Sequence, residues 1–340
     1  MQPIEGVCRK AESSHQKIKL IIILIQKVPA LSVIICTHNP RPEFLRRVLD
    51  ALKAQTLPLE QWELLLADNA SKEWLDQLYD LSWHPNGRHL REETLGKAHA
   101  LLTAMGEAKG ELLMTVDDDN VLRSDFLANS LEIAKAFPFL GAWGGHVEGE
   151  FEQEVPDWLK PHLSALAVRP VDRDYWSNYY TDNRSMPFGA GLTVRKPVAI
   201  AYAKAMLARP VSAELGRKGS SLVSGEDVDL AMMAYDLGLG TGMFQRLYLT
   251  HIIPRTRMTV EYLCRLLEAI EYSTHILKSH RDPAYIPAED ESKLRKWLRT
   301  FQVWRLPEPA RSVVKAENRG FAKAKAEIIS KRNALSVSAT

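Results

Sequence analysis

The sequence predicts an α/β fold in which a mostly parallel sheet is flanked by helices. Three short apolar segments have the composition of buried strands, and each ends in a polar cluster. Segments with apolar residues at helical spacing lie between and after them. Strands that alternate with helices imply βαβ units. The length of 340 residues allows one large domain or two small ones.

The predicted elements follow one another along the chain. Strands are expected at residues 31–37, 62–67, 111–116, 188–195 and 244–250. Helices are expected at residues 45–52, 97–108, 124–137 (with Ser124 as the cap), 198–208 and 225–237. Residues 150–187 and 210–224 are rich in turn formers and are predicted to form irregular loops.

Composition excludes several classes of protein. The formal net charge of +2 is too small to indicate nucleic-acid binding by the whole protein. Cys8, Cys36 and Cys264 form neither a disulfide framework nor a zinc pattern, which favours a reducing, cytoplasmic location. The uncharged apolar run at residues 20–25 is shorter than a signal peptide core of about 7–15 residues. Residues 1–29 are therefore interpreted as an N-terminal extension, and secretion is not expected.

Polar residues end the first three predicted strands, at 37–39, 68–69 and 117–119. Ligands of parallel sheets bind beyond the carboxyl ends of the strands, so we expect these residues to converge on one crevice. The consecutive Asp117, Asp118 and Asp119 repel one another unless a cation offsets their charge. Mg²⁺ and Mn²⁺ prefer oxygen ligands and retain substrate phosphates. The alternative is an acidic turn that caps the next helix.

Four segments, taken in order, resemble the family 2 glycosyltransferases with the GT-A fold. They are Val33–Asn39, Ala67–Ser71, Val116–Asp119 and Gly225–Leu230, and the match covers roughly residues 31–255. The resemblance implies a Rossmann-like nucleotide-binding GT-A domain with a mixed sheet, which we place at residues 30–257. Residues 258–340 are then a C-terminal helical, basic extension.

The activity that the resemblance implies is metal-dependent transfer of a sugar from a nucleotide diphosphate sugar. A UDP-sugar is the favoured donor, and a hydroxyl of a glycan or lipid-linked molecule is the expected acceptor. The enzyme would be of the hexosyltransferase type, would act in polysaccharide biosynthesis, and would invert the anomeric centre.

The resemblance also assigns the nucleotide site. Thr37, His38 and Asn39 match the segment that lines the base and ribose. Asp68, followed by Asn69, matches an aspartate that hydrogen-bonds the base. The alternatives are that His38, which stands where many relatives have tyrosine, is a simple loop residue, and that Asp68-Asn69 is an ordinary turn.

The metal and diphosphate are assigned to a second group of residues. Asp117 would approach the ribose, and Asp119 would ligate Mn²⁺ or Mg²⁺, with Asp118 between them in the nucleotide-sugar site. His251 matches a histidine that completes the metal site in some relatives, and imidazole favours Mn²⁺ over Mg²⁺. Lys97 is a candidate for the diphosphate. The alternative for His251 is a buried strand-end histidine, and the alternative for Lys97 is a solvent-facing helix lysine.

Catalysis is assigned to the start of the helix expected at residue 225. Asp227 matches the base that activates the acceptor hydroxyl, with Glu226 beside it. The alternative is that both are first-turn acids that interact with the helix dipole.

The C-terminal extension is strongly basic. Between Lys293 and Arg332 there are 12 Lys or Arg residues and three Glu. Apolar residues fall on one side of an expected helix, namely Leu294, Trp297, Leu298, Phe301 and Trp304. Such a face can lie on the anionic inner surface of a membrane, or it can pack on the catalytic domain or a partner subunit. The sequence leaves the oligomeric state open.

There are three rival functions. A sugar nucleotidyltransferase would need a glycine-rich phosphate loop after the first strand, and a dehydrogenase would need GxGxxG there. His38-Asn39-Pro40 occupies that place. A degenerate, non-catalytic module that binds a nucleotide sugar or glycan is the third alternative.

Overall fold

The computed structural model describes residues 28–180, 182–208, 222, 225–287 and 301–338. The expectations for the N-terminal extension before residue 28 lie outside these ranges. The same holds for the loop at 210–224 except Leu222, and for Leu294, Trp297 and Leu298 of the expected basic helix.

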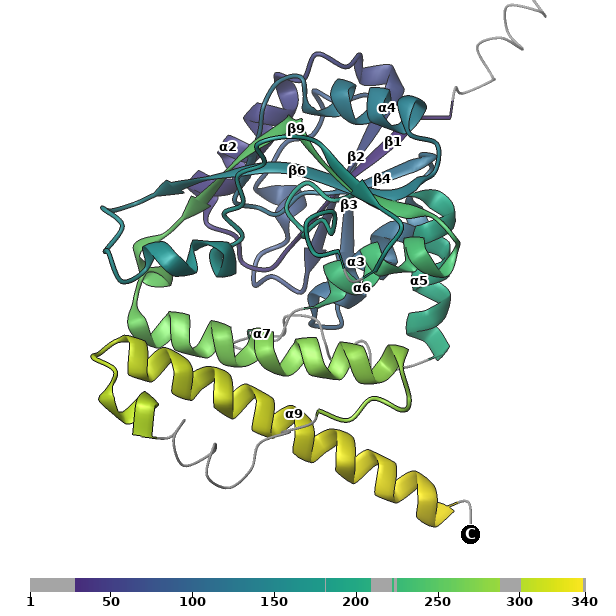
Figure 1. The fold of residues 1–340 in the computed structure, drawn as a ribbon. Helices are drawn as coiled ribbons and strands as arrows, with labels where there is room; N and C mark the ends of the chain where they lie inside the picture. The colour runs from purple at the N-terminus through teal and green to yellow at the C-terminus, as the bar shows by residue number, and fades with distance from the viewer. Residues whose placement is uncertain (1–27, 181, 209–221, 223–224, 288–300, 339–340) are drawn as a thin grey trace, which may run out of the picture.

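Within the described residues, nine strands form one mixed sheet (Figure 1). Its order is β3-β2-β1-β4-β8-β6-β9-β5, and β7 also pairs with β9. Strands β8, β5 and β7 run antiparallel to their neighbours, whereas the others share one direction. The bounds are β1 Leu31–Thr37, β2 Trp62–Asn69, β3 Gly87–Glu92, β4 Leu112–Thr115, β5 Asn120–Leu122, β6 Leu140–Phe151, β7 Tyr175–Ser177, β8 Thr193–Arg195 and β9 Gly240–Ile253. The predicted α/β class with a mixed, helix-flanked sheet is confirmed.

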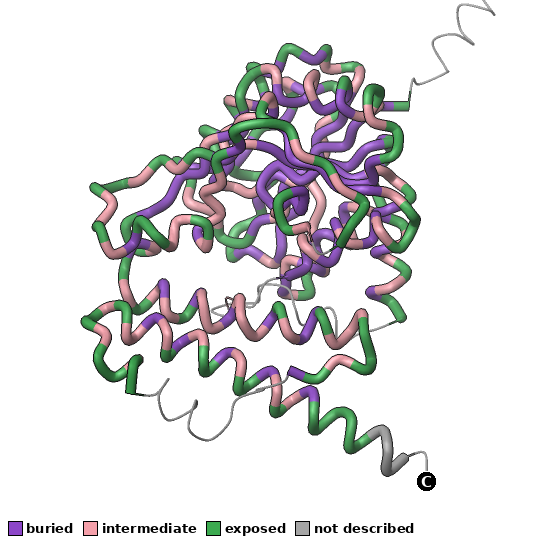
Figure 2. The backbone as a smooth tube through the Cα atoms, viewed as in Figure 1, coloured by how far each residue is buried: buried purple, intermediate pink, exposed green. Residues whose placement is uncertain are grey.

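Alternating side chains of the parallel strands supply two cores, one on each face of the sheet. In β1, Val33 and Ile35 belong to one core and Ile34 to the other. The first face is covered by α2 (Pro42–Lys53) and α4 (Phe126–Ala136). The second is covered by α3 (Lys97–Glu107), α5 (Lys196–Ala208) and α6 (Glu226–Asp236). Figure 2 shows the sheet as the buried centre of the molecule.

Two long helices, α7 (Val260–Arg281) and α9 (Ala310–Ser338), lie side by side beyond α6 (Figure 1). Ile276 and Leu277 of α7 form a small core with Ala324 and Ile328 of α9, against which Val228 of α6 also packs. None of the described helices is long and apolar enough to span a membrane. Phe301 and Trp304 stack with ring centroids 6.0 Å apart and are exposed, and contact with a membrane surface stays a prediction.

Some expected elements differ from the structure. The helix expected to be capped by Ser124 begins at Phe126, with Asp125 at the N-cap position. The strand expected at 188–195 is confined to β8, because the chain turns at Gly191, whose φ is +67°.

Strands β3, β5, β6 and β7 were not predicted. Four glycines, at 141, 144, 145 and 149, interrupt the apolar pattern of β6. Strand β3 is a half-buried, polar edge strand whose sequence carries little strand signal. The 150–187 region also contains a 3₁₀ helix, η3 (Lys160–Leu166).

Candidate active site

A cavity of about 820 Å³ opens at the carboxyl edge of the sheet. Eleven of the twelve predicted site residues line it: Thr37, His38, Asn39, Asn69, Lys97, Asp117, Asp118, Asp119, Glu226, Asp227 and His251. They come from the ends of β1, β2, β4 and β9 and from the first turns of α3 and α6. Asp68 is the twelfth, and it lies outside the lining. The shared strand direction brings the polar strand ends to this edge, as the sequence predicted.

The loop after β1 is fixed to the loop after β2. Asn39 has a positive φ of 48°, its N–H donates to Ser71 Oγ at 2.8 Å, and its Oδ1 accepts from the N–H of Lys72. His38 Nδ1 lies 2.7 Å from the carbonyl oxygen of Asn69, so Nδ1 is the donor. The two loops therefore form one rigid wall of the cavity.

Asp68 is a buried anchor, with 1% of its surface exposed. Its carboxylate accepts from the N–H groups of Ser71 and Leu75 and forms an ion pair with Arg91 at 2.6 Å. Burial alone would raise the pKa of Asp68. The hydrogen bonds have a larger effect in the opposite direction, so the net pKa of Asp68 is lowered. Its predicted contact with a base stays a prediction.

Asn69 holds the start of α3. Its Oδ1 accepts from the N–H of Gly96 at 2.7 Å, and its Nδ2 donates to the carbonyl of Thr94 at 2.8 Å. Gly96 has a φ of +142°, which a residue with a side chain rarely adopts. This arrangement places Lys97, the first residue of α3, at the cavity.

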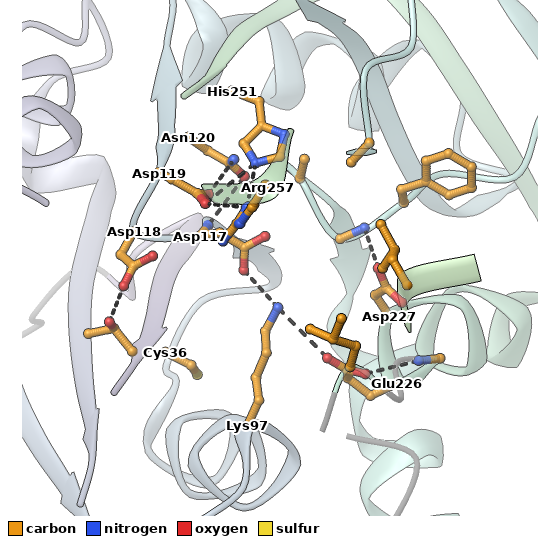
Figure 3. Close-up of a pocket in the computed structure, with 18 of the residues that line it drawn as sticks. Cys36, Lys97, Asp117, Asp118, Asp119, Asn120, Glu226, Asp227, His251 and Arg257 are labelled. Atoms are coloured by element: carbon orange, nitrogen blue, oxygen red, sulfur yellow. Dashed lines mark hydrogen bonds and ion pairs between the residues drawn. The ribbon is translucent and has the colours of Figure 1, made fainter. Parts of the chain in front are cut away.

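Lys97 lies between two acidic walls of the site (Figure 3). Its Nζ is 2.7 Å from Asp117 Oδ1 and 3.8 Å from Glu226 Oε1. Burial raises the pKa of Glu226, Lys97 lowers it and Asp227 raises it, and the net direction is upward. The Lys97 ammonium thus partly offsets the charge that Glu226 carries in a buried position.

Asp118 points back toward β1, where Thr37 Oγ1 donates to its Oδ2. Burial and the neighbouring Asp119 raise the pKa of Asp118 to about 6, against the effect of the Thr37 hydrogen bond. Burial also raises the pKa of the nearby Cys36 thiol to about 12, so it lines the cavity as a neutral group.

Asp119, which directly precedes β5, lies close to His251 of β9, whose partner in the antiparallel pair is Asn120. His251 Nε2 is 3.4 Å from Asp119 Oδ2, and both side chains are buried. The other Asp119 oxygen accepts from Asn120 Nδ2 at 3.1 Å, which turns Oδ2 toward His251. Arg257 reaches the same point: its Nη1 is 3.0 Å from Asp119 Oδ2 and 3.2 Å from His251 Nε2.

The donor set of this corner fits a divalent cation that brings ligands of its own. One carboxylate oxygen and one imidazole nitrogen converge, and both are ligands that Mn²⁺ accepts. Among the described residues, no group of three or more His, Cys, Asp or Glu side chains is arranged to hold a metal. The residues present therefore suit a cation that arrives with phosphate oxygens.

Asp227 lies on the opposite wall, at the start of α6. Its Oδ2 accepts from the N–H of Gly189 at 2.7 Å, and its Oδ1 accepts from the N–H of Val228 at 2.8 Å. Thr115 Oγ1 in turn donates to the carbonyl of Gly189 at 3.0 Å. These contacts tie the carboxylate of α6 to β4 and fix its orientation toward the cavity.

Arg257 and Asn120, which complete the Asp119 corner, were not predicted from the sequence. Their only signal was proximity in the sequence, of Asn120 to Asp119 and of Arg257 to His251. Arg255 is also near His251, so this signal does not distinguish Arg257 from Arg255. An apolar part of the cavity was also missed, because α7 supplies it from outside the predicted catalytic domain: Tyr262, Leu266, Leu267, Ile270 and Leu277.

Comparison with known families identifies the N-terminal part of this arrangement. The model of "Glycosyl transferase family 2" matches residues 32–206, just over half of the chain. The match includes the ends of β1, β2 and β4 and the first turn of α3, whereas Glu226, Asp227 and His251 lie beyond it. No curated protein matches the sequence.

One solved structure shows the same fold. The mannosyltransferase PcManGT from Pyrobaculum calidifontis, solved with GDP-Man and Mn²⁺, aligns with a TM-score of 0.53 and 18% identity, over 88% of this chain and 87% of that one. S. aureus TarS aligns with a TM-score of 0.49 and 13% identity, over 88% of this chain. The alignment spans 54% of that TarS chain.

Proposed function

Because the chain belongs to glycosyl transferase family 2 and is a glycosyltransferase, we propose that it transfers a hexosyl group from a nucleotide diphosphate sugar. The proposed donor is a UDP-sugar, and the proposed acceptor is a hydroxyl of a glycan or lipid-linked molecule. The reaction is metal-dependent and inverts the anomeric centre.

The observation that carries this proposal is the placement of two acidic groups on opposite walls of one cavity (Figure 3). Asp117, Asp118 and Asp119 follow β4 on one wall, and Glu226 and Asp227 begin α6 on the other. A donor diphosphate held at the first wall leaves its sugar between the walls, where a base on α6 can reach the acceptor.

In the proposed mechanism, Asp227 removes the proton from the acceptor hydroxyl as its oxygen attacks the anomeric carbon. The bond from that carbon to the diphosphate oxygen breaks, and one displacement inverts the centre. The N–H groups of Gly189 and Val228 hold the Asp227 carboxylate in one orientation, so little rearrangement is needed at the moment of transfer. Lys97 lies within reach of both acidic walls and is proposed to bind the diphosphate.

Asp119 and His251 are the residues proposed to hold Mn²⁺ or Mg²⁺. When bound, the cation neutralises charge that develops on the leaving nucleotide diphosphate. Asn120 keeps one oxygen of Asp119 occupied and so presents the other to the site.

Thermal unfolding with UDP, GDP and dTDP, each with Mn²⁺ and with EDTA, tests the donor site. PcManGT was solved with GDP-Man, which is why GDP is compared with UDP. A nucleotide at 100 times its dissociation constant stabilises the folded state by about 2.7 kcal/mol. We expect a Mn²⁺-dependent rise in the unfolding midpoint with UDP.

A Mn²⁺-dependent rise in the unfolding midpoint with GDP or dTDP, but not with UDP, would change the proposed base of the donor. The proposed sugar transfer would stand. No rise with any of the three would contradict the proposed donor site. As a control, Asp119→Ala should lose most of the Mn²⁺-dependent part of the rise.

A further inference from the structure

Arg257 makes contacts that no step of the proposed reaction requires. It belongs to the short 3₁₀ helix η5 (Arg255–Arg257), which follows β9 and precedes α7. Its side chain is 25% exposed and lines the cavity. Burial lowers the pKa of the Arg257 guanidinium, but Asp119 and the neighbouring acidic groups raise the pKa by more than burial lowers it. The net pKa is raised, so the group is a permanent cation.

The guanidinium engages the same two atoms that suit a metal ion. Nη1 is 3.0 Å from Asp119 Oδ2 and 3.2 Å from His251 Nε2. Arginine has no acceptor, so His251 Nε2 must be the acceptor and must offer its lone pair. The Nδ1 of His251 is buried without a hydrogen-bond partner in the described residues, so no hydrogen bond at Nδ1 fixes the imidazole.

A divalent cation needs the lone pair of His251 Nε2 and the charge of Asp119 Oδ2. A guanidinium within 3.2 Å of both atoms uses them already and repels a second cation at short range. A nucleotide diphosphate changes this balance, because its charged oxygens offer the planar guanidinium a bidentate acceptor in exchange.

We propose that Arg257 is an internal cation that holds the Asp119–His251 corner until a nucleotide diphosphate binds. This inference rests on the proposed metal-dependent function. The diphosphate draws Arg257 away from Asp119 and His251, and the metal takes its place. Metal and nucleotide therefore bind together, and the metal alone binds weakly.

The test measures Mn²⁺ binding to the full chain from the electron paramagnetic resonance signal of free Mn²⁺, first with no nucleotide. Arg257→Gln keeps a polar side chain but removes the competing charge. We expect this variant to bind Mn²⁺ alone at least about fivefold tighter than the wild type, the low end of usual coupling between sites. Adding Asp119→Asn to Arg257→Gln should abolish the gain, because the gained ion lies at Asp119.

Arg255→Gln is the matched control. It removes the same charge from the same 3₁₀ helix, but Arg255 is exposed and does not line the cavity. It should bind Mn²⁺ as the wild type does. Arg257→Lys keeps a cation within reach of Asp119 and should stay close to the wild type. Thermal unfolding of each variant checks that it is folded.

A second arm adds UDP or GDP at saturating concentration. The difference in Mn²⁺ affinity between Arg257→Gln and the wild type should shrink, because Arg257 has then left Asp119 in the wild type. In EDTA, Arg257→Gln should bind the nucleotide more weakly than the wild type.

Equal Mn²⁺ affinity of Arg257→Gln and the wild type without nucleotide would overturn the inference, even where the nucleotide stabilises the wild type. A second pair of results would also overturn the inference. The wild type would bind the nucleotide equally well in Mn²⁺ and in EDTA, and Arg257→Gln would not bind it. Arg257 would then replace the metal permanently. A wild type that binds no nucleotide would instead contradict the proposed function, while the Mn²⁺-only comparison would still decide the role of Arg257.

Discussion

The N–H of Gly189 donates a hydrogen bond to Asp227 Oδ2 at 2.7 Å, and a Cβ added at Gly189 would lie 2.7 Å from the same oxygen. No side chain fits between the two residues without moving the carboxylate. The orientation of Asp227 is therefore set by a glycine on the segment that joins β7 to β8.

Gly189→Ala should lower turnover roughly ten- to hundredfold, because small displacements of a catalytic group have effects of this size. Steady-state kinetics with the donor that the binding experiment selects would measure it. Gly106→Ala, at an exposed helix position where an added Cβ meets nothing within 4 Å, is the control and should leave turnover unchanged. Wild-type turnover in Gly189→Ala would show that Asp227 need not hold this position.

Asp227→Asn tests the role of the carboxylate itself. The amide keeps the size of the side chain but cannot take a proton, so kcat should fall about 10²–10⁴-fold. Nucleotide binding should stay near the wild-type value, because Asp227 lies on the wall away from Asp119 (Figure 3). Retained transfer activity would remove Asp227 from the role of base.

The sequence allowed the convergence of the polar strand ends on one cavity to be predicted, because parallel strands follow a simple rule. Strands β1, β2 and β4 are short apolar runs, and a polar residue after each must face the carboxyl edge. The acidic start of α6 was identified in another way, from the resemblance of Gly225–Leu230 to the family 2 glycosyltransferases.

What the sequence did not predict depends on contacts between distant segments. Arg255 and Arg257 look equivalent in the sequence, and only the turn of η5 decides which one reaches Asp119. The ion pair of Asp68 with Arg91 was not predicted, because Arg91 lies on the edge strand β3, and the contact of Asp68 with a base stays a prediction. Strand β6 was not predicted because its four glycines lack apolar side chains and lie close to neighbouring segments, as Gly145 does to the carbonyl oxygen of Leu247.

His84 predicts how stability depends on pH. The ring centroids of His84 and Trp62 are 4.1 Å apart, and the His84 side chain is buried, with 3% exposed. Its Nε2 has no hydrogen-bond partner in the described residues. Burial lowers the pKa of His84 from 6.5 to about 4, although Glu60 and Glu63 oppose this. Between these values the unfolded chain takes up a proton that the folded protein does not. Stability should therefore fall as pH drops from 6.5 toward 4.

The contribution of His84 over this window is about 3 kcal/mol, since one pKa unit corresponds to 1.36 kcal/mol. His84→Phe cannot titrate, so its free energy of unfolding should fall less steeply between pH 6.5 and pH 4. Urea denaturation at several pH values in this range measures both curves. Parallel curves for the variant and the wild type would contradict the assignment.

Gly320 marks a close approach of α9 to α7. A Cβ added there would lie 2.3 Å from the carbonyl oxygen of Glu268 and 3.0 Å from Glu271 Cβ. The pair is also joined by an ion pair between Arg319 and Glu268 at 2.7 Å and by a hydrogen bond from Tyr272 to Glu327 at 2.6 Å. Since the two backbones are this close, any larger residue must push α9 away and loosen these contacts.

Gly320→Ala should therefore lower the free energy of unfolding by about 1–3 kcal/mol, the usual cost of overpacking. Gly106→Ala is again the control, because it gains helix propensity without a clash and should raise stability by about 0.5–1 kcal/mol. Urea denaturation measures the two opposite changes in one experiment. Equal stability of Gly320→Ala and Gly106→Ala would show that α9 does not pack on α7 at this distance. The cavity lining that α7 supplies would then not depend on α9.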